Sequence, residues 1–490
     1  MIDRRRFLLQ SAAIGAAAAS GPLPSAFARQ PSFASPLLVP PLLEGTLKDG
    51  RRVYDLTVGS GKSRFLVGLE TATIGINGAY LGPTIRCRPG DKVTLRVRNT
   101  LAEPTTVHWH GLHLPARFDG GPHQVIETGG TWEPAFEIKQ QPSLCWYHSH
   151  LMGRTGEQVL RGLAGLFLIS PTDRTQANLP SDYGIDDIPL VIQDRRFQAD
   201  GSFEYVTSMH DVMMGYFGNV VLVNGTVAPF FAVRRKRTRL RVLNGSNARI
   251  YNFGFDDGRE FAVIGSDGGL LERPSRQRTI RLAPGERTEL LVELSTNETV
   301  RFAAYPLGDR TPAAGRGLSL LELRAGTLEG DAPPVAEQLA TLPSWKPEAA
   351  RIRTFELQMG MMGMGRGSMM GGGMMGGPGA MAINGRAMDP AYINERVALG
   401  ATEIWEIRNP TPLPHPFHIH NIQFRVLDRN GRPPLPQERG LKDTVLVEPR
   451  SMVRVITLFA NYADPERPYM YHCHNLEHED AGMMGQFVVA

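Results

Sequence analysis

Cysteine is scarce in this sequence. The 490 residues include only three cysteines, Cys87, Cys145 and Cys473. Three thiols cannot build a disulfide framework, and they cannot supply the closed, cysteine-rich ligand sets that structural zinc sites prefer. A covalent or zinc-based scaffold is therefore excluded. Cys87 and Cys145 lie in apolar, strand-like runs, where they either pair with each other or stay buried as free thiols.

Charge of one sign and long apolar runs are also lacking. The chain has 53 Lys and Arg against 49 Asp and Glu, a net charge of +4, which is too small to indicate a polyanionic partner. The densest basic run, residues 234–237, leads into an alternating stretch without aromatic neighbours, so we expect a solvated strand edge and no nucleic-acid partner. Beyond the N-terminal segment no run is long enough to span a bilayer, so no membrane anchor is expected after processing.

The N-terminal segment has the pattern of an export signal. Residues 1–28 combine a charged head, an apolar middle and the small-residue end "AFA", which predicts cleavage after Ala28. Arg4 and Arg5, followed by Phe7 and Leu8, fit the twin-arginine pattern; an ordinary Sec signal is the alternative. We therefore expect a periplasmic monomer that uses the Tat export machinery.

Glycine and proline, by contrast, are abundant, with 53 and 37 residues, which indicates many turns and an all-β fold. One pattern occurs three times: Asn-Gly, a variable stretch, and an alternating strand that ends in Asn. The repeats start at Asn77, Asn224 and Asn384, 147 and 160 residues apart. This spacing predicts three copies of one β-sandwich domain.

The repeat also suggests domain boundaries. We predict domains at residues 35–175, 176–330 and 350–490, with a proline-rich linker at 331–349 before the third. Within the third domain, residues 359–381 alternate methionine with glycine. Glycine at this density cannot hold a packed element, so a flexible Met/Gly-rich loop is predicted.

Ten of the thirteen histidines fall into two groups, one in the first domain and one in the third. Eight of them form His-x-His pairs: His108 with His110, His148 with His150, His418 with His420, and His472 with His474. Side chains two apart on a strand face the same way, so each pair can present two imidazoles to one metal or to two neighbouring metals. An exposed strand face would explain one such pair but not four. The pairs come equally from both domains, so a multi-metal cluster is predicted between them.

Four further residues near the C-terminus suit a second site. His415, Cys473 and His478 form the His2Cys set of a blue-copper site, with Met483 as a weak axial ligand. On a strand, Cys473 faces one side as thiolate while the flanking His472 and His474 face the other, toward the cluster. Cys473 is therefore predicted to be both a ligand and an electron path.

The motifs "HWHGLH", "WYHSH", "HPFHIH" and "HCHNLEHEDAGMM" resemble those of the multicopper oxidases, most closely the CueO-type periplasmic cuprous oxidases and bacterial laccases, over nearly all of the mature chain. The resemblance implies three cupredoxin-like Greek-key β-sandwich domains and four copper ions: one type 1, one type 2 and two type 3. It implies a type 1 site at His415, Cys473, His478 and Met483, and type 2 ligands at His108 and His418. The implied type 3 ligands are His110, His148, His150, His420, His472 and His474.

The same resemblance implies an oxidase with O2 as acceptor. Electrons would enter singly at the type 1 copper, and O2 would be reduced to water at the three-copper cluster. Asp119 and Glu479 match positions that the family uses for proton supply. A turn residue is the alternative for Asp119, and a solvated loop acid for Glu479.

Three functions remain as alternatives, and the first two differ in the reductant. Thioethers prefer Cu(I), so Met359, Met361, Met362 and Met364 are candidate ligands for substrate copper in a protein that serves copper tolerance. The chain departs from the cuprous oxidases, however, with Thr411 and Leu413 where those enzymes carry Asp and Met. Phenols or aromatic amines, with the loop as a lid, are the second alternative. A non-enzymatic copper-binding or partner-binding protein of the same fold is the third.

Overall fold

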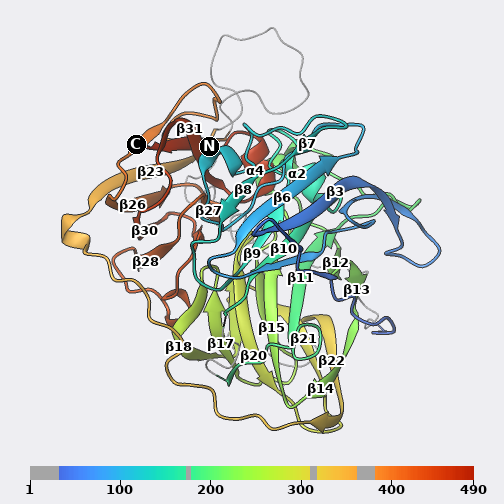
Figure 1. Ribbon diagram of the computed structural model, residues 1–490. Coiled ribbons are helices and arrows are strands. Elements are labelled where there is room, and N and C mark those ends of the chain that lie inside the picture. The colour runs from blue at the N-terminus through green and yellow to red at the C-terminus, as the bar shows by residue number, and fades with distance from the viewer. Residues whose placement is uncertain (1–31, 173–177, 309–316, 361–380) are drawn as a thin grey trace, which may run out of the picture.

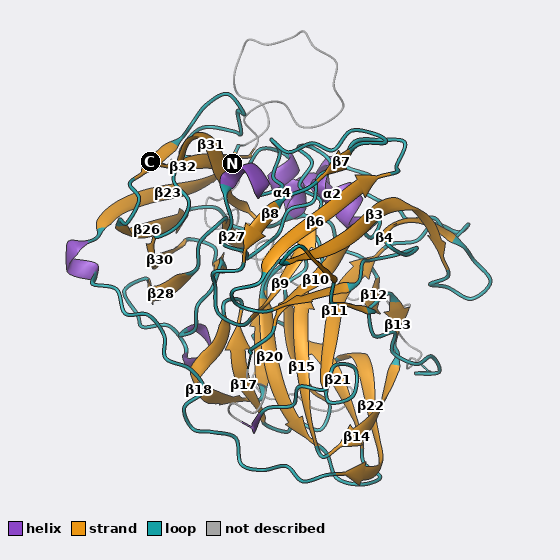
Figure 2. Cartoon of the chain, in the orientation of Figure 1, coloured by secondary structure: helices purple, strands orange, loops and turns teal. Residues whose placement is uncertain are grey.

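The computed structural model describes residues 32–172, 178–308, 317–360 and 381–490. The predicted signal peptide and the candidates Met361, Met362 and Met364 lie outside these ranges. Strands dominate and the helices are short (Figure 2), so the all-β prediction is confirmed. Within the described ranges, no helix combines the length and apolar character needed to cross a membrane.

Two sheets form in each third of the chain (Figure 1). In the first third the strand orders are β1-β5-β10-β9 and β2-β3-β6-β7, with β4 paired to β3 and β8 to β6. The strands are β1 (Leu42–Leu43), β2 (Thr46–Lys48), β3 (Arg51–Ser63), β4 (Thr71–Ile76), β5 (Thr84–Cys87), β6 (Lys92–Asn99), β7 (Thr131–Trp132), β8 (Ala135–Glu137), β9 (Ser143–His148) and β10 (Ala164–Ile169). A 3-10 turn at Ala116–Phe118 and helix α2 (Thr155–Leu160) complete this part.

In the second third the strand orders are β13-β12-β11-β15-β20-β17-β18 and β14-β22-β21-β16-β19. The strands are β11 (Asp187–Arg195), β12 (Val220–Val223), β13 (Thr226–Val227), β14 (Phe230–Arg235), β15 (Arg237–Asn244), β16 (Tyr251–Phe255), β17 (Phe261–Ser266), β18 (Gly269–Gln277), β19 (Thr279–Leu282), β20 (Arg287–Glu293), β21 (Thr299–Tyr305) and β22 (Leu318–Glu329). Helix α3 (Met209–Met214) follows β11.

In the last third the strand orders are β24-β23-β26-β30-β28 and β25-β32-β31-β27-β29. The strands are β23 (Arg351–Met359), β24 (Met381–Ile383), β25 (Glu395–Val397), β26 (Thr402–Asn409), β27 (His415–Ile419), β28 (Phe424–Arg429), β29 (Thr444–Val447), β30 (Ser451–Leu458), β31 (Asp464–Cys473) and β32 (Met484–Val489). Helix α4 (Leu476–Asp480) and 3-10 turns at Pro347–Ala349 and Pro436–Glu438 complete it. Each sheet pair falls within one of the ranges predicted from the repeat, and we propose those ranges as the three domains.

The Asn-Gly repeat forms the same turn three times. Asn77, Asn224 and Asn384 have φ values of 54°, 50° and 52°, in the left-handed region that Asn tolerates better than most residues. Each Oδ1 accepts an N–H from the adjoining strand, and each Nδ2 donates to a carbonyl two residues earlier on that strand. The bonded strand runs parallel to the one that closes the repeat, as β3 with β6, β11 with β15 and β23 with β26. The sequence repeat therefore marks a repeated sheet corner.

Each domain has its own hydrophobic core, and a fourth cluster that includes Leu144, Trp146 and Leu243 joins the first two domains. The third domain meets both others through α4, which packs on α2 (Figure 2) and on α3. Asp480 accepts the N–H groups of Thr155 and Gly156 at the start of α2, each at 2.9 Å. The first and third domains are thus held together directly after Cys473.

Glu477 forms the matching contact with the second domain. Its carboxylate accepts the Tyr216 N–H at 2.9 Å and the Asn247 side-chain amide at 2.8 Å.

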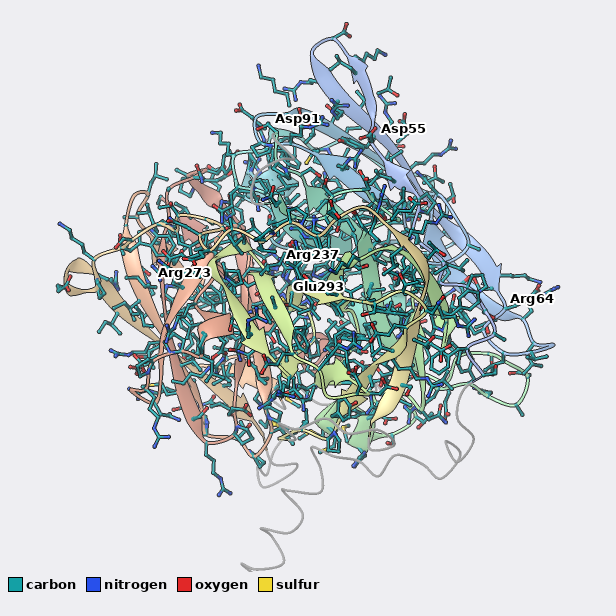
Figure 3. All side chains as sticks on the ribbon, turned by 90° about the horizontal axis from the view of Figure 1, so that it is seen from below. Asp55, Arg64, Asp91, Arg237, Arg273 and Glu293 are labelled. Atoms are coloured by element: carbon teal, nitrogen blue, oxygen red, sulfur yellow. The ribbon has the colours of Figure 1, made fainter. Side chains whose placement is uncertain are left out.

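The predicted basic strand edge is partly neutralised, because Arg237 pairs with Glu293 at 2.6 Å (Figure 3). Cys87 and Cys145 are buried free thiols and do not pair.

Candidate metal centre

The structure brings the predicted His2Cys set together at the end of the third domain. The Cys473 Sγ lies 3.4 Å from Nδ1 of His415 in β27 and 3.7 Å from Nδ1 of His478 in α4. The two Nδ1 atoms are 3.2 Å apart. Met483 is fully buried beside them: its N–H donates to the His478 carbonyl at 2.9 Å, and its carbonyl accepts the Cys473 N–H at 3.0 Å.

Both imidazoles of this set are oriented by contacts on their far side. The His415 Nε2 donates to the Thr411 hydroxyl at 2.8 Å, and the His478 Nε2 donates to the Met213 carbonyl of α3 at 3.0 Å. A proton on Nε2 leaves the Nδ1 lone pair directed at the sulfur. Burial lowers the pKa of His478 to about 4 and raises the pKa of the Cys473 thiol. The thiolate therefore needs a cation beside it.

The eight paired imidazoles meet in the interior between the first and third domains, all of them buried. The register of β27 with β31 sets His418 opposite His472, and an antiparallel bridge sets His108 opposite His148. Rings from the two domains stack: the ring centroids of His108 and His420 are 3.8 Å apart, and those of His110 and His418 are 3.7 Å apart. The four pairs form one cluster, as the sequence predicts.

One side of the cluster is a three-histidine group. The Nε2 atom of His472 lies 3.3 Å from that of His150 and 3.2 Å from that of His420. The three Nδ1 atoms face carboxylates: Glu479 lies 3.2 Å from His150 and 3.0 Å from His472, and Asp119 lies 2.7 Å from His420. With protons on Nδ1, three Nε2 lone pairs converge, which is favourable only around a cation.

The other side consists of His110, His148 and His474. The His148 Nδ1 donates to the Ser149 carbonyl at 2.7 Å, and its Nε2 lies 3.4 Å from Nδ1 of His110. His110 is reversed relative to the others, because its Nε2 donates to Asp443 at 3.0 Å. The His474 ring centroid lies 5.0 Å from that of His110, and neither nitrogen of His474 has a hydrogen-bond partner among the described residues.

The remaining two imidazoles, His108 and His418, are arranged alike. Their Nδ1 atoms donate to the main-chain carbonyls of Asp119 and Asp443, both at 2.8 Å. Their Nε2 atoms are buried and have no hydrogen-bond partner in the part of the chain that the structure describes. This pair can hold one ion between the two domains.

These residues fit copper. Burial lowers the pKa values of His148 to about 3 and of His150 to about 4, so both imidazoles are neutral and able to act as ligands at neutral pH. Buried polar atoms without partners, such as the two nitrogens of His474, cost free energy unless an ion satisfies them. Imidazole-rich sites beside a His2Cys set suit copper, whereas structural zinc sites are closed tetrahedral sets.

The structure adds Asp443, which sequence reasoning missed. Asp119 supports His108 through its carbonyl and His420 through its carboxylate; Asp443 supports His418 and His110 in the same two ways. The available signal was an acidic residue after a His-x-His pair in both domains. Its spacing differs, 11 residues for Asp119 and 25 for Asp443, so no fixed motif reveals it.

Other predicted residues fall around these groups. Met359 is half-buried at the end of β23 and packs on the hydrophobic core that contains Cys473 and Met483. Trp146 also packs here and stacks on His148, with ring centroids 4.1 Å apart. Thr411 and Met213 were not recognised as imidazole partners in the sequence, because neither lies in a histidine motif.

Comparison with known proteins agrees with this geometry. Family models described as multicopper oxidase match residues 57–174, 182–308 and 359–490. The multicopper oxidase mco of Staphylococcus aureus is 35% identical over 445 residues, covering 90% of this chain and 89% of that protein. The cell division protein FtsP of Xenorhabdus nematophila is 35% identical over 499 residues, covering 100% and 98%.

Solved structures share the fold. The laccase-like multicopper oxidase CueO from Ochrobactrum sp. has a TM-score of 0.83 at 36% identity, covering 93% of this chain and 100% of that one. The multicopper oxidase of Campylobacter jejuni, described as a metallo-oxidase, has a TM-score of 0.80 at 29% identity, covering 93% and 95%. The chain therefore belongs to the multicopper oxidase family, and it shares that family's cupredoxin-like fold and oxidase character.

Proposed function

We propose that the protein oxidises Cu(I) at a type 1 copper and reduces O2 to water at a three-copper cluster, with four copper ions in all. The observation that carries this proposal is the position of Cys473. Its Sγ faces His415 and His478, while the adjacent residue His472 belongs to the three-histidine group. One peptide bond therefore separates the two groups.

The proposed copper positions follow the ligand groups described above. The type 1 ion is held by His415, Cys473, His478 and Met483, and the type 2 ion by His108 and His418. One type 3 ion is held by His150, His420 and His472, and the other by His110, His148 and His474. Bound copper supplies one-electron oxidation at the first position and multi-electron O2 reduction at the cluster.

The protein's own acids supply and hold protons beside the cluster. Glu479 lies against Nδ1 of His150 and of His472, and Asp119 accepts from Nδ1 of His420. Burial raises the pKa of the Asp119 carboxyl group well above its usual value, and no Arg or Lys pairs with it in the described part of the chain. We assign proton supply to Asp119 and Glu479 on this basis.

Cu(I) is favoured as the reductant by two thioethers in the described residues. Met213 of α3 and Met359 of β23 are half-buried, and both pack on the core that contains Cys473 and Met483. The main chain of Met213 also covers the outer edge of His478. Soft sulfur ligands bind Cu(I) in preference to hard cations.

A laccase-type activity on phenols or aromatic amines is the second candidate. Thr411 and Leu413 replace the Asp and Met expected of cuprous oxidases, and the relative from Ochrobactrum sp. is described as active towards lignin model compounds. The third candidate is a non-enzymatic copper-binding or partner-binding protein of the same fold, and the full-length similarity to FtsP, described as a cell division protein, is the observation on its side.

O2 uptake by the copper-loaded protein distinguishes the candidates. It is measured with Cu(I) and with a phenol, for the unaltered chain, for the double variant M213L/M359L and for a chain lacking residues 361–380. Met→Leu nearly conserves volume, so packing is retained while the thioether is lost. The matched control is M452L, because Met452 is also half-buried but does not belong to the described core that Met213 and Met359 contact.

Loss of Cu(I) turnover in M213L/M359L and in the chain lacking residues 361–380, with phenol turnover retained, supports the cuprous oxidase. Equal turnover of Cu(I) by M213L/M359L and M452L contradicts it and favours the laccase. Absence of O2 uptake with either reductant leaves the partner-binding function.

We also propose that the protein is exported by the twin-arginine pathway and works in the periplasm as a monomer. Residues 4 and 5, "RR" in the signal segment, carry this proposal. The variant R4K/R5K should remain in the cytoplasm, and cell fractionation with copper analysis of each fraction tests it. Export of R4K/R5K at the normal level would indicate a Sec signal instead.

A further inference from the structure

The second domain supplies none of the predicted copper ligands, but one of its turns contacts His474 directly and reaches His110 through Asp443. The second-domain turn, as we name residues 283–287, consists of the link between β19 and β20 and the first residue of β20, Arg287. Gly285 has a φ of +82°, and a Cβ at this position would lie 2.9 to 3.0 Å from atoms of the His474 ring. The ring therefore rests directly on the Gly285 main chain.

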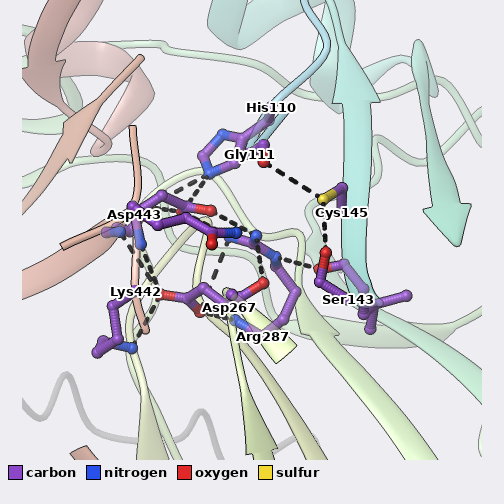
Figure 4. Close-up of polar contacts among 12 residues, drawn as sticks. His110, Gly111, Ser143, Cys145, Asp267, Arg287, Lys442 and Asp443 are labelled. Carbon is purple, nitrogen blue, oxygen red and sulfur yellow. Dashed lines mark hydrogen bonds and ion pairs between the residues drawn. The ribbon is translucent and has the colours of Figure 1, made fainter. Parts of the chain in front are cut away.

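Two residues further on, the turn reaches Asp443. Arg287 is fully buried and donates from Nη1 and Nη2 to the two Asp443 carboxylate oxygens, at 2.7 and 2.5 Å (Figure 4). Its other bonds go to main-chain carbonyls: Leu144 at 2.8 Å, Gly285 at 3.0 Å and Asp267 at 3.1 Å. The guanidinium is thus fixed by the first, second and third domains together.

Asp443 transmits this position to His110. Its Oδ1 accepts from Nε2 of His110 at 3.0 Å (Figure 4) and from the Thr444 hydroxyl at 2.9 Å. A proton held on Nε2 leaves Nδ1 of His110 as the nitrogen that faces His148. Gly111 allows the close packing, because a Cβ there would lie 2.7 Å from both Arg287 Nη2 and Asp443 Oδ2.

The other type 3 position has a different support. His150, His420 and His472 face the carboxylates of Asp119 and Glu479, which belong to the first and third domains. The second-domain turn therefore supports two ligands of one type 3 position, while those two acids face the ligands of the other.

We propose that residues 283–287 are a positioning element for one of the two type 3 copper ions, acting on His110 through Arg287 and Asp443 and on His474 through Gly285. This assignment rests on the proposed copper cluster. Carboxylates that orient metal-binding histidines typically change metal affinity or activity about 10- to 100-fold when replaced. Disturbing the turn should weaken that one copper position by a similar factor.

Two variants disturb the turn's action by independent means. D443N removes the charge that Arg287 and His110 share, and its amide cannot accept both of the Arg287 N–H groups that the carboxylate accepts. G285A adds one methyl group against His474 and changes no charge. R287K separates charge from geometry, since lysine keeps the positive charge beside Asp443 but cannot donate to both carboxylate oxygens as the guanidinium does.

A buried carboxylate on β20, the strand that begins with Arg287, provides the control. Glu289 of β20 is buried and pairs with Arg241 at 2.6 Å, and within the described ranges no histidine pairs with it. E289Q therefore matches D443N in the loss of a buried paired carboxylate.

Copper per chain after dialysis against a chelator, the blue thiolate absorption and the near-ultraviolet absorption of the paired copper ions are measured for each protein. D443N and G285A should retain about one copper ion fewer per chain and lose the near-ultraviolet band, with the blue band unchanged. R287K should be intermediate, and E289Q should keep all copper. If D443N does not fold, G285A decides.

Full copper and an unchanged near-ultraviolet band in G285A and D443N would overturn the positioning role. Equal copper loss in E289Q would do the same, since it would indicate general destabilisation. If the unaltered protein shows no paired-copper band after loading, the proposed cluster itself fails, and the positioning role fails with it.

Discussion

The hydroxyl of Thr411 is predicted to control the type 1 copper. It accepts from Nε2 of His415 at 2.8 Å and is buried, with 6% of the residue exposed. Valine has nearly the same shape as threonine but no hydroxyl. Thr411→Val therefore leaves the Nε2–H of His415 without this partner and frees the ring to turn its Nδ1 away from Cys473.

Two arguments give the same magnitude for this loss. A buried donor left without a partner costs about 1–3 kcal/mol. Loss of the group that orients a metal-binding histidine costs about 10- to 100-fold in metal affinity, which is about 1.4–2.8 kcal/mol at 1.4 kcal/mol per tenfold. We expect the type 1 copper of Thr411→Val to bind about 10- to 100-fold more weakly, with the cluster unaffected.

Chelator competition, followed by the blue absorption, measures this affinity. Thr411→Ser keeps the hydroxyl and is the matched control, with an expected midpoint close to that of the unaltered protein. The reasoning is refuted if Thr411→Val gives up its blue copper at the same chelator concentration as Thr411→Ser.

The remaining predictions concern the sulfur ligand, the α4 contact and acid stability. Cys473→Ser should abolish the blue absorption and O2 uptake while copper analysis still finds the cluster ions; a retained blue band would contradict the assignment. Asp480→Asn, which weakens the contact with the start of α2, should cost about 1–3 kcal/mol in denaturant unfolding, whereas Asp331→Asn in the exposed linker should cost little. The metal-free protein should lose stability as pH falls from 6.5 towards 4. Over this range the histidines of the unfolded chain bind protons, whereas the buried histidines of the folded chain stay neutral. For His478, with its pKa lowered from 6.5 to about 4, the loss is about 2 kcal/mol at pH 5; urea midpoints that do not fall over this range would contradict it.

The site could be predicted from sequence as far as strand geometry reaches. Alternation along a strand is a local property, so the opposite facing of Cys473 and His472 followed from their being neighbours. The three Asn-Gly turns were equally local, since each Asn adopts positive φ and bonds to the adjoining strand. These patterns determined the all-β fold, the repeat and the grouping of the histidines.

Tertiary structure alone decided which nitrogen of each imidazole faces the cluster and which groups hold it there. His110 is reversed because it meets Asp443, 333 residues away in sequence, and Asp443 is held by Arg287 from a third part of the chain. The same is true of Met213, whose carbonyl meets His478 across 265 residues. Such contacts depend on how separate sheets dock against one another, and no periodicity within a single strand contains that information.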